Sequence, residues 1–430
     1  MMKKTILFAI LGVFTLFSCT RKEDINDEIR PDKKLNATLA EYKDILTAAP
    51  NGWVGYLYPS GGGGFTFKFN FNKDETVSMY AILSEEYATT AKSSLFSLRA
   101  PQIPSLYFDT YNYLHELADP KITKYGGTYS VGAGGDFEFG IVDVGPDTIK
   151  LRGNFRKSDL ILIKAKASEG DDFIAKAYDF VQNKLGKIER FPYYYKKLSV
   201  NGKDYAITIN TDKSTVSIWH TKEGKTSSFY TEYAVSDNGI MLRKAFTDGD
   251  FVLQSLSDIE VDLVASKAVL KVNNTINAEI TNVAEPIAIS TEGPIQLYGN
   301  YSKTYTSYGF NYDGVKDYFK LQEEPSLQGA YFKQRYYIDN YDVMYYDYLN
   351  ANNASTRYIS VMRGNINTPN VIKYSVNNYN GTSPGGTLAT KIANIRSWFG
   401  DSEGYYVYPT GNGFYDLVSV ADGKKWIRLY

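Results

Sequence analysis

The sequence predicts a mainly β protein of the α+β class, built from repeated units in which one helix packs on a curved antiparallel sheet. Three observations lead to this prediction. The 430 residues include 38 Tyr, 23 Phe and 35 Gly, and aromatic residues favour pleated strands while glycine favours tight turns. Apolar and polar residues alternate over many short segments, which is the period of a strand. Helical periodicity occurs at three places, each followed by such segments.

Residues 1–18 are predicted to be a lipoprotein signal peptide. Two lysines precede an apolar stretch that is too short to span a bilayer comfortably, as in a secretion signal rather than a membrane helix. Leu16-Phe17-Ser18-Cys19 resembles a bacterial lipobox, in which the cysteine is lipidated. Cys19 is the only cysteine, so it has no disulfide partner, and lipidation would consume its thiol. A secretory peptide with an incidental cysteine is the alternative.

Residues 19–31 are expected to form a disordered polar tether, because they show no apolar periodicity. Lys22-Glu23-Asp24 resembles the export signal of surface-exposed lipoproteins. We therefore expect an outer-membrane lipoprotein that is held by its acyl chains and displayed at the cell surface. A solvated linker that happens to carry charge is the other interpretation of these three residues.

The first folded unit is predicted for residues 32–168 and begins with a helix. Apolar residues recur at helical spacing over about 32–48, and Pro50-Asn51-Gly52 ends the helix. Strand-like segments follow, and the first strong alternation after the Gly61–Gly64 turn is aromatic. The aromatic positions of this alternation are Phe65, Phe67, Phe69 and Phe71.

A second unit is predicted for residues 169–290, and duplication of the first unit is one explanation of its origin. A helix begins near Asp171 and strands follow, so the order of the first unit recurs. A local match supports duplication, because Ile149–Leu162 aligns with Ile240–Leu253 in one register without a gap. Each helix would then cover the apolar face of its own sheet.

Residues 291–430 are predicted to be a Tyr-rich β region with a C-terminal helix. This region either stands alone or is fused to the second domain. The helix is indicated by apolar residues at helical spacing, namely Leu388, Ile392, Ile395, Trp398 and Phe399.

The composition excludes several classes of function. Without residues 1–18, two of the 47 basic residues are lost, which leaves 45 basic and 48 acidic side chains; no basic stripe indicates a nucleic-acid partner. His115 and His220 are the only histidines and no second thiol exists, which argues against a His/Cys metal site and against a histidine-dependent triad. We therefore expect no metal, no cofactor and no assigned catalytic residue.

The densest cluster of polar side chains lies between Leu106 and Pro120. It could supply an acid and a base, but we favour a structural role, in which the residues start and end a short helical turn. The residues concerned are Asp109, Thr110, Tyr111, His115 and Asp119.

The chain resembles a family of Bacteroidota lipoproteins built around a domain of unknown function (DUF 4302 type). The resemblance rests on Cys19, Gly52-Trp53, Phe108-Asp109-Thr110-Tyr111 and Leu151-Arg152-Gly153, and it is densest over residues 30–165. Members are commonly encoded beside SusC/SusD-type outer-membrane uptake systems and a zinc-metallopeptidase-like lipoprotein. The resemblance implies an accessory role in the cell envelope, with a SusC/SusD-like complex as partner, and it supplies no catalytic residue.

Aromatic side chains give the remaining indication of function. Tyr and Trp rings can stack on sugars or peptide side chains while their polar edges form hydrogen bonds; ordinary cross-strand packing is the alternative. The residues predicted to bind a ligand are Trp53, Tyr336, Tyr337, Tyr341, Tyr345 and Tyr346.

The sequence therefore favours a lipid-anchored, non-catalytic accessory protein that binds a glycan or peptide for an outer-membrane uptake system. Two alternatives stay open: a carboxylate-dependent glycan hydrolase, and a structural or adhesive surface protein.

Overall fold

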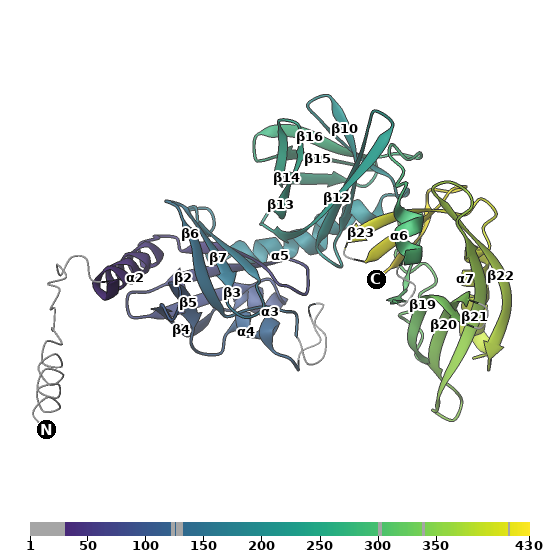
Figure 1. Cartoon of the computed structure of the whole chain (residues 1–430), viewed down its shortest axis with the longest axis horizontal. Helices are drawn as coiled ribbons and strands as arrows, with labels where there is room; N and C mark the ends of the chain where they lie inside the picture. The colour runs from purple at the N-terminus through teal and green to yellow at the C-terminus, as the bar shows by residue number, and fades with distance from the viewer. Residues whose placement is uncertain (1–30, 122–124, 126–131, 300–302, 338–339, 412) are drawn as a thin grey trace, which may run out of the picture.

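The structure is a computed structural model. It describes residues 31–121, 125, 132–299, 303–337, 340–411 and 413–430, except for the side chain of Tyr337. Three β bodies follow one another along the chain: two closed eight-stranded barrels and one nine-stranded sheet (Figure 1). The protein is mainly β and its strands pair antiparallel, which confirms the predicted class. Cys19 and the signal and tether segments lie outside the described residues.

The first barrel closes because β1 pairs with β2 on one side and with β8 on the other. The aromatic residues of the predicted alternation point into its interior, where Phe67 and Phe69 are fully buried. A short helix α3 (Glu85–Thr89) follows β3, and α4 (Tyr113–Ala118) follows β5. The strands are β1 (Trp53–Tyr58), β2 (Phe65–Phe71), β3 (Thr76–Ala81), β4 (Lys92–Arg99), β5 (Ser105–Phe108), β6 (Glu138–Val144), β7 (Thr148–Gly153) and β8 (Asp159–Lys164).

Helix α2 (Pro31–Thr47) precedes this barrel and packs its last turn against the barrel interior. Leu46 is buried there, and the carbonyl of Leu46 accepts a hydrogen bond from Trp53 Nε1 at 2.9 Å. Gly52 links helix and strand with a φ of +70°, and a Cβ at this position would overlap the carbonyl oxygen of Phe69. The Gly-Trp pair is thus the joint between α2 and the barrel.

The second barrel begins after helix α5 (Phe173–Asn183) and the 3₁₀ helix η3 (Leu185–Arg190). It closes because β9 pairs with both β10 and β16. Its core contains Leu185 and Ile188 of η3 together with inward side chains of every strand. The strands are β9 (Lys196–Val200), β10 (Lys203–Asn210), β11 (Thr215–Lys222), β12 (Lys225–Val235), β13 (Ile240–Asp248), β14 (Phe251–Asp262), β15 (Lys267–Val272) and β16 (Ile276–Asn282).

The third unit is a nine-stranded sheet with a core of its own. Helix α7 (Gly386–Phe399) packs on one face of the sheet through Leu388, Ile392, Ile395 and Phe399. Helix α6 (Gly293–Gly299) leads into the unit. The strand order is β17 (Thr304–Thr306), β19 (Leu327–Tyr337), β20 (Tyr341–Leu349), β21 (Ser355–Asn365), β22 (Val371–Gly381), β23 (Tyr405–Gly411), β24 (Phe414–Ser419), β25 (Lys425–Leu429) and β18 (Gly309–Tyr312).

The predicted arrangement of one helix covering one sheet in each repeat differs from what the barrels show. Phe173 and Ile174 of α5 pack in a cluster between the two barrels, while Ala177 and Phe180 contact the second barrel's core. The physical reason is that a sheet closed on itself buries its apolar face inside, so it needs no helix to cover that face.

The local match that suggested duplication falls on strands at different positions. Ile149–Leu162 spans β7 and β8, the last two strands of the first barrel, whereas Ile240–Leu253 spans β13 and β14, the fifth and sixth strands of the second. The two matching sequence segments therefore form hairpins that occupy different positions in their barrels.

The two barrels pack tightly against each other. Tyr58 donates a hydrogen bond from its hydroxyl to the carbonyl of Met241 at 2.9 Å, and Thr66 donates one to the carbonyl of Val235 at 2.6 Å. Arg243 of the second barrel forms an ion pair with Asp159 of the first at 2.6 Å. These contacts join the two barrels, and α5 runs from the first barrel to the second beneath the second barrel (Figure 1).

Candidate functional site

Two of the predicted ligand-binding residues lie in cores. Trp53 is fully buried in the first barrel, and Tyr346 is fully buried beneath α7. Neither ring is available to a ligand at the surface, so the structure assigns both to packing and corrects the prediction for them. The reason is their position: Trp53 stands where α2 closes on the barrel, and Tyr346 points to the inner face of β20.

The Asp109–Asp119 segment is held by structural contacts. Asp109 forms an ion pair with Arg99 at 2.7 Å, and the Thr110 hydroxyl accepts a hydrogen bond from the backbone N–H of Leu95 at 2.9 Å. Asp119 accepts a hydrogen bond from the backbone N–H of Lys121 at 2.8 Å as α4 ends. Half-exposed Tyr111 donates from its hydroxyl to Glu116 at 3.3 Å, and burial followed by the charge of Glu116 raises the pKa of Tyr111 to about 12.

His115 completes the N-terminal cap of α4. Asn112 accepts a hydrogen bond from the N–H of Leu114 at 3.0 Å, and the Asn112 N–H donates to Nδ1 of His115 at 3.2 Å. The imidazole also stacks on Phe137, with ring centroids 4.2 Å apart. Burial, and then the charge of Lys92, lower the pKa of His115 to about 4. A neutral, capped imidazole of this kind is a structural residue at neutral pH.

The Leu151-Arg152-Gly153 motif also has a structural explanation. Leu151 is buried inside the barrel, and Arg152 forms an ion pair with Asp159 on the outside. Gly153 leaves room for the buried carboxylate of Asp136, since a Cβ on Gly153 would lie 1.9 Å from Asp136 Oδ2. That carboxylate accepts hydrogen bonds from three backbone N–H groups and one hydroxyl in the 155–158 turn.

A surface formed by the outward side chains of β19–β21 contains two of the other predicted tyrosines, Tyr336 and Tyr345. We call it the tyrosine face and define it by Tyr331, Lys333, Tyr336, Tyr345 and Arg357. Tyr331 and Tyr345 are cross-strand partners with nearly parallel rings 5.0 Å apart between centroids, and Tyr336 stacks on Tyr345 at 6.1 Å. Tyr336 is 45% exposed. The period of two in β20 sends Tyr345 to this face and Tyr346 to the core.

Cationic side chains lie over these rings. The Arg357 guanidinium is 4.2 Å from the Tyr345 ring centroid, and Lys333 Nζ is 4.6 Å from that of Tyr336. Arg357 also forms two hydrogen bonds with Asp347, at 2.6 and 2.8 Å. Predicted Tyr341 lies next to this face under Arg363, with 4.4 Å between the guanidinium carbon and the ring centroid. Tyr337 belongs to β19, and its side chain lies outside what the structure describes.

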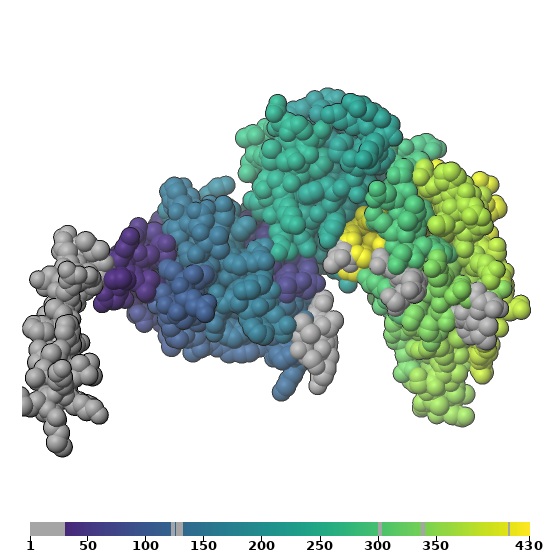
Figure 2. Space-filling view, viewed as in Figure 1, coloured from purple at the N-terminus to yellow at the C-terminus, as the bar shows by residue number. Residues whose placement is uncertain are grey.

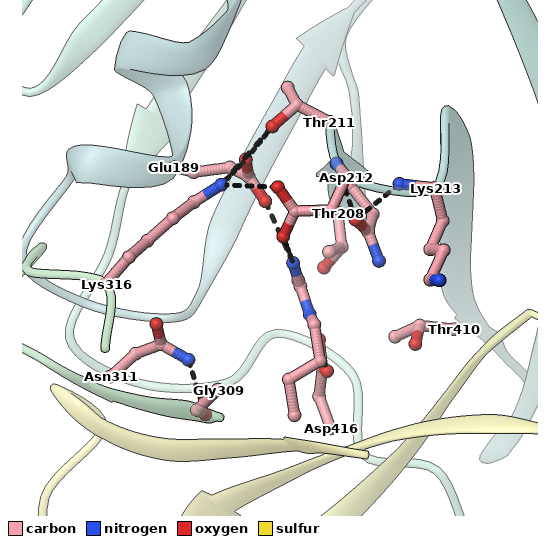
Figure 3. Close-up of polar contacts among 12 residues, drawn as sticks. Glu189, Thr208, Thr211, Asp212, Lys213, Gly309, Asn311, Lys316, Thr410 and Asp416 are labelled. Carbon is pink, nitrogen blue, oxygen red and sulfur yellow. Dashed lines mark hydrogen bonds and ion pairs between the residues drawn. The ribbon is translucent and has the colours of Figure 1, made fainter. Parts of the chain in front are cut away.

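Sequence reasoning missed a buried ion network between the second barrel and the third unit (Figure 3). Arg428 of β25 binds Asp416 through two hydrogen bonds, at 3.0 and 3.1 Å, and binds Glu189 of η3 at 3.0 Å. Glu189 also pairs with Lys316 at 2.6 Å, and Lys316 reaches Asp212 at 3.2 Å. No spacing in the sequence relates residues so far apart.

The charges in this network set one another's ionisation. Burial alone would raise the pKa of Glu189, but Arg428 and Lys316 outweigh it and hold the pKa below its usual range. Burial is likewise opposed at Asp212, whose pKa is lowered by Lys316 and then Arg428. The network is therefore ionised at neutral pH and joins the second barrel to the C-terminal strands.

Within the described part of the chain, no group of three or more His, Cys, Asp or Glu side chains is placed to hold a metal ion. In the same residues, no helix has the length and apolar character needed to cross a membrane.

A family model described as Domain of unknown function (DUF4302) matches residues 23–259. No curated protein matches the chain. The matched residues include Gly52-Trp53, Phe108–Tyr111 and Leu151–Gly153, whose contacts are given above, and they end inside β14, so the third unit lies beyond them. Because the match spans more than half of the 430 residues, the chain belongs to the DUF4302 family, a family whose domain has no known function.

Proposed function

We propose that this protein is a lipid-anchored accessory protein of the cell envelope that binds a glycan or peptide without catalysis. The single observation that supports this function is the tyrosine face, where stacked rings and cations lie together on the outer side of the sheet, with Tyr336 45% exposed and Tyr345 9% exposed. We place the protein in a Bacteroidota outer membrane beside a SusC/SusD-type uptake system, on the resemblance of its motifs to lipoproteins encoded there.

The chemistry of the tyrosine face suits a glycan or a peptide. A tyrosine ring offers an apolar surface to the C–H groups of a sugar or side chain, and its hydroxyl can donate or accept a hydrogen bond. Asp347 holds the Arg357 guanidinium over Tyr345 through two hydrogen bonds, which orients the remaining N–H donors. Lys333 forms no ion pair with any described carboxylate, so its ammonium group can serve a ligand.

The proposed anchor is tested by replacing the cysteine. In a Cys19→Ala variant the full chain should leave the membrane pellet and appear in the soluble fraction, because no acyl chain is attached. Two or more acyl chains are needed for stable attachment, since each buried methylene contributes only about 0.8 kcal/mol. Equal membrane attachment of the variant and the natural chain would contradict lipidation at Cys19.

The proposed ligand surface is tested by titrating the chain from Thr20 onward with a panel of glycans and peptides. Tyr336→Ala should weaken the ligand that binds by about tenfold, since an aromatic contact of this kind contributes roughly 0.5–1.5 kcal/mol beyond its buried area. Tyr318→Ala is the matched control, because Tyr318 belongs to the same unit and is 46% exposed against 45% for Tyr336.

The outcomes separate the proposed function from its alternatives. Saturable binding without product, weakened by Tyr336→Ala and not by Tyr318→Ala, is the expected result. Release of shortened glycan would favour the hydrolase, and absence of both binding and product would favour the structural or adhesive protein. Gentle solubilisation followed by purification should recover a SusC-like porin with the full chain, and its absence would contradict the uptake complex.

A further inference from the structure

A cleft of about 470 Å³ lies where the two barrels and the third unit meet. The β1–β2 turn of the first barrel, the β10–β11 turn and β12 of the second barrel, and Phe414 of β24 line it. Figure 2 shows a hollow between the blue first barrel and the green third unit, with yellow C-terminal residues at its back. The volume falls in the range of about 300–1,000 Å³ that small-molecule sites occupy.

The glycine turn of the first barrel keeps one wall of this cleft open. Gly62 and Gly63 have φ values of +101° and +78°, which glycine adopts without strain. A Cβ on Gly62 would meet nothing within 4 Å, so the space in front of the turn is unfilled. Gly64 lets the β1–β2 turn approach the second barrel closely, because a Cβ on Gly64 would lie 2.2 Å from the carbonyl oxygen of Tyr233.

Two lysines lie near Phe414, an aromatic side chain that lines the cleft: Lys213 lines the cleft itself, and Lys303 approaches the same ring from beside the lining residues. Lys213 Nζ is 5.6 Å from the ring centroid of Phe414 and 4.8 Å from that of Tyr430. Lys303 Nζ is 5.3 Å from the Phe414 centroid and donates a hydrogen bond to the carbonyl of Gly413 at 2.7 Å. Both ammonium groups are thus held beside one ring by contacts that do not neutralise them.

The carboxylates near these two lysines form ion pairs with other cationic side chains. Asp212 binds Lys316 at 3.2 Å and accepts a hydrogen bond from Tyr430 at 3.0 Å. Glu232 faces Arg243 at 3.7 Å. Figure 3 shows the Lys213 side chain leaving the turn on the side away from the Asp212 carboxylate. Among the described residues, no carboxylate forms an ion pair with Lys213 or Lys303.

Burial is the main influence on the ionisation of both lysines. Burial lowers the pKa of Lys213, with Asp212 opposing the change. Burial also lowers the pKa of Lys303, and the charge of Lys213 lowers it further. An anion placed between the two ammonium groups would relieve their mutual repulsion, and partial burial strengthens such an attraction relative to open water.

We propose that this cleft binds an anionic, ring-containing small molecule of the sugar-acid class. Its carboxylate lies between Lys213 and Lys303, and its ring packs against Phe414 and Tyr230, a cleft tyrosine that is 43% exposed. The site is separate from the tyrosine face and does not depend on the proposed function. An inorganic phosphate ion would satisfy the two lysines alone, without using the aromatic walls.

Calorimetric titration of the chain from Thr20 onward tests the proposal with three probes: galacturonate, its neutral counterpart galactose, and inorganic phosphate. Galacturonate should bind at least tenfold more tightly than galactose because of its carboxylate, and more tightly than phosphate because of its ring. Lys213→Gln and Lys303→Gln should each weaken galacturonate at least tenfold. Lys225→Gln is the matched control, since Lys225 is an exposed lysine at the start of β12, in the same barrel as Lys213, and lies outside the cleft.

Four results would overturn the proposal. The first three are equal affinity for galacturonate and galactose, unchanged galacturonate binding in both lysine variants, and no saturable binding of galacturonate up to about 10 mM. That limit is ten times the concentration that corresponds to about −4.1 kcal/mol. The fourth is phosphate binding that is tighter than galacturonate binding, which would replace the sugar-acid site with an inorganic anion site. A melting temperature equal to that of the natural chain shows that a variant is folded, and Tyr336→Ala should leave galacturonate binding unchanged, which separates this site from the tyrosine face.

Discussion

At the scale of single residues, His115 shows a titratable side chain that the fold uses as a helix cap. Its Nδ1 accepts the Asn112 N–H, and its ring is stacked on Phe137. The folded-state pKa of about 4 lies below the ordinary value of 6.5. As the pH falls, the unfolded chain therefore takes up the proton before the folded chain does. His115 consequently costs stability as the pH falls from about 6.5 toward 4 and has no such cost at neutral pH.

We predict that His115→Gln loses less stability than the natural chain between pH 6.5 and pH 4. Glutamine at the third helical position can still accept the capping hydrogen bond, so stability at pH 7 should be nearly unchanged. His115→Ala lacks the acceptor and should lose about 0.5–2 kcal/mol at pH 7. Urea denaturation at the two pH values measures both effects. His220→Gln, which changes the other histidine, is the control, and an identical pH dependence in His115→Gln and the natural chain would refute the assignment.

The residue scale also shows where sequence reasoning ended. Leu151-Arg152-Gly153 was recognisable as a motif, but the reason for Gly153 is the carboxylate of Asp136 on the other side of a turn. Trp53 was recognisable as an aromatic anchor, but its burial depends on the approach of Leu46. In both cases a tertiary neighbour gives the residue its role.

At the scale of elements, periodicity predicted that α2, α5 and α7 exist, and it placed both ends of α2 and the start of α5 within two residues, because helical spacing is a local property. The apolar face predicted for α2 is the face that packs: Leu35, Leu39 and Ile45 are half-buried, and Leu46 on the same face is the buried residue of the helix. The spacing did not predict that burial would be complete only in the last turn. The closed barrel leaves only its open end for α2 to cover, so only the last turn enters a core.

We predict that Leu46→Ala destabilises the first barrel by about 2–5 kcal/mol, the usual cost of such a truncation in a core. The helix and the Trp53 hydrogen bond to the backbone carbonyl should remain, because neither uses the leucine side chain. Leu95→Ala is the control, since Leu95 on β4 is 46% exposed, and surface changes usually stay within about 0.5 kcal/mol. Chemical denaturation followed by tryptophan fluorescence measures both, and equal losses in the two variants would show that α2 does not seal the barrel.

At the scale of the whole molecule, the buried network around Arg428 decides how the third unit sits on the second barrel. Glu189 and Arg428 are 239 residues apart in the sequence and both nearly fully buried. Removal of one partner leaves an uncompensated buried charge, which costs far more than the loss of an exposed pair. An aromatic cluster that includes Tyr194, Trp219, Tyr408 and Trp426 packs in the same interface.

We predict that Arg428→Met destabilises the interface by about 3–5 kcal/mol, because Glu189 and Asp416 then lack their main partner. Arg99→Met is the control: its pair with Asp109 is exposed, and exposed pairs contribute about 0–1 kcal/mol. Scanning calorimetry of both variants at pH 7 gives the comparison. A loss in Arg428→Met no larger than in Arg99→Met would show that the network does not hold the units together.

The same network should make the interface sensitive to acid. The folded-state pKa values of Glu189 and Asp212 are lowered, so their contribution is complete above the ordinary values of about 4 and is lost as the pH falls through the folded values. Glu189→Gln should therefore be less stable than the natural chain at pH 7, and the difference should shrink as the pH falls below about 4. Melting temperatures over this pH range measure it, and a constant difference would contradict an ionised Glu189.

The sequence by itself determined the local features of this protein: a mainly β chain, three helices, a sheet face rich in tyrosine, and a single cysteine in a lipobox-like segment. Each follows from residue type and spacing within about twenty positions. Only the tertiary structure decided that two sheets close into barrels, that Tyr346 lies in the core while Tyr345 lies on the outer face under Arg357, and that Lys213 and Lys303 approach one ring. Strand closure and the meeting of three units depend on pairings between residues far apart in the chain, and periodicity carries no information about such pairings.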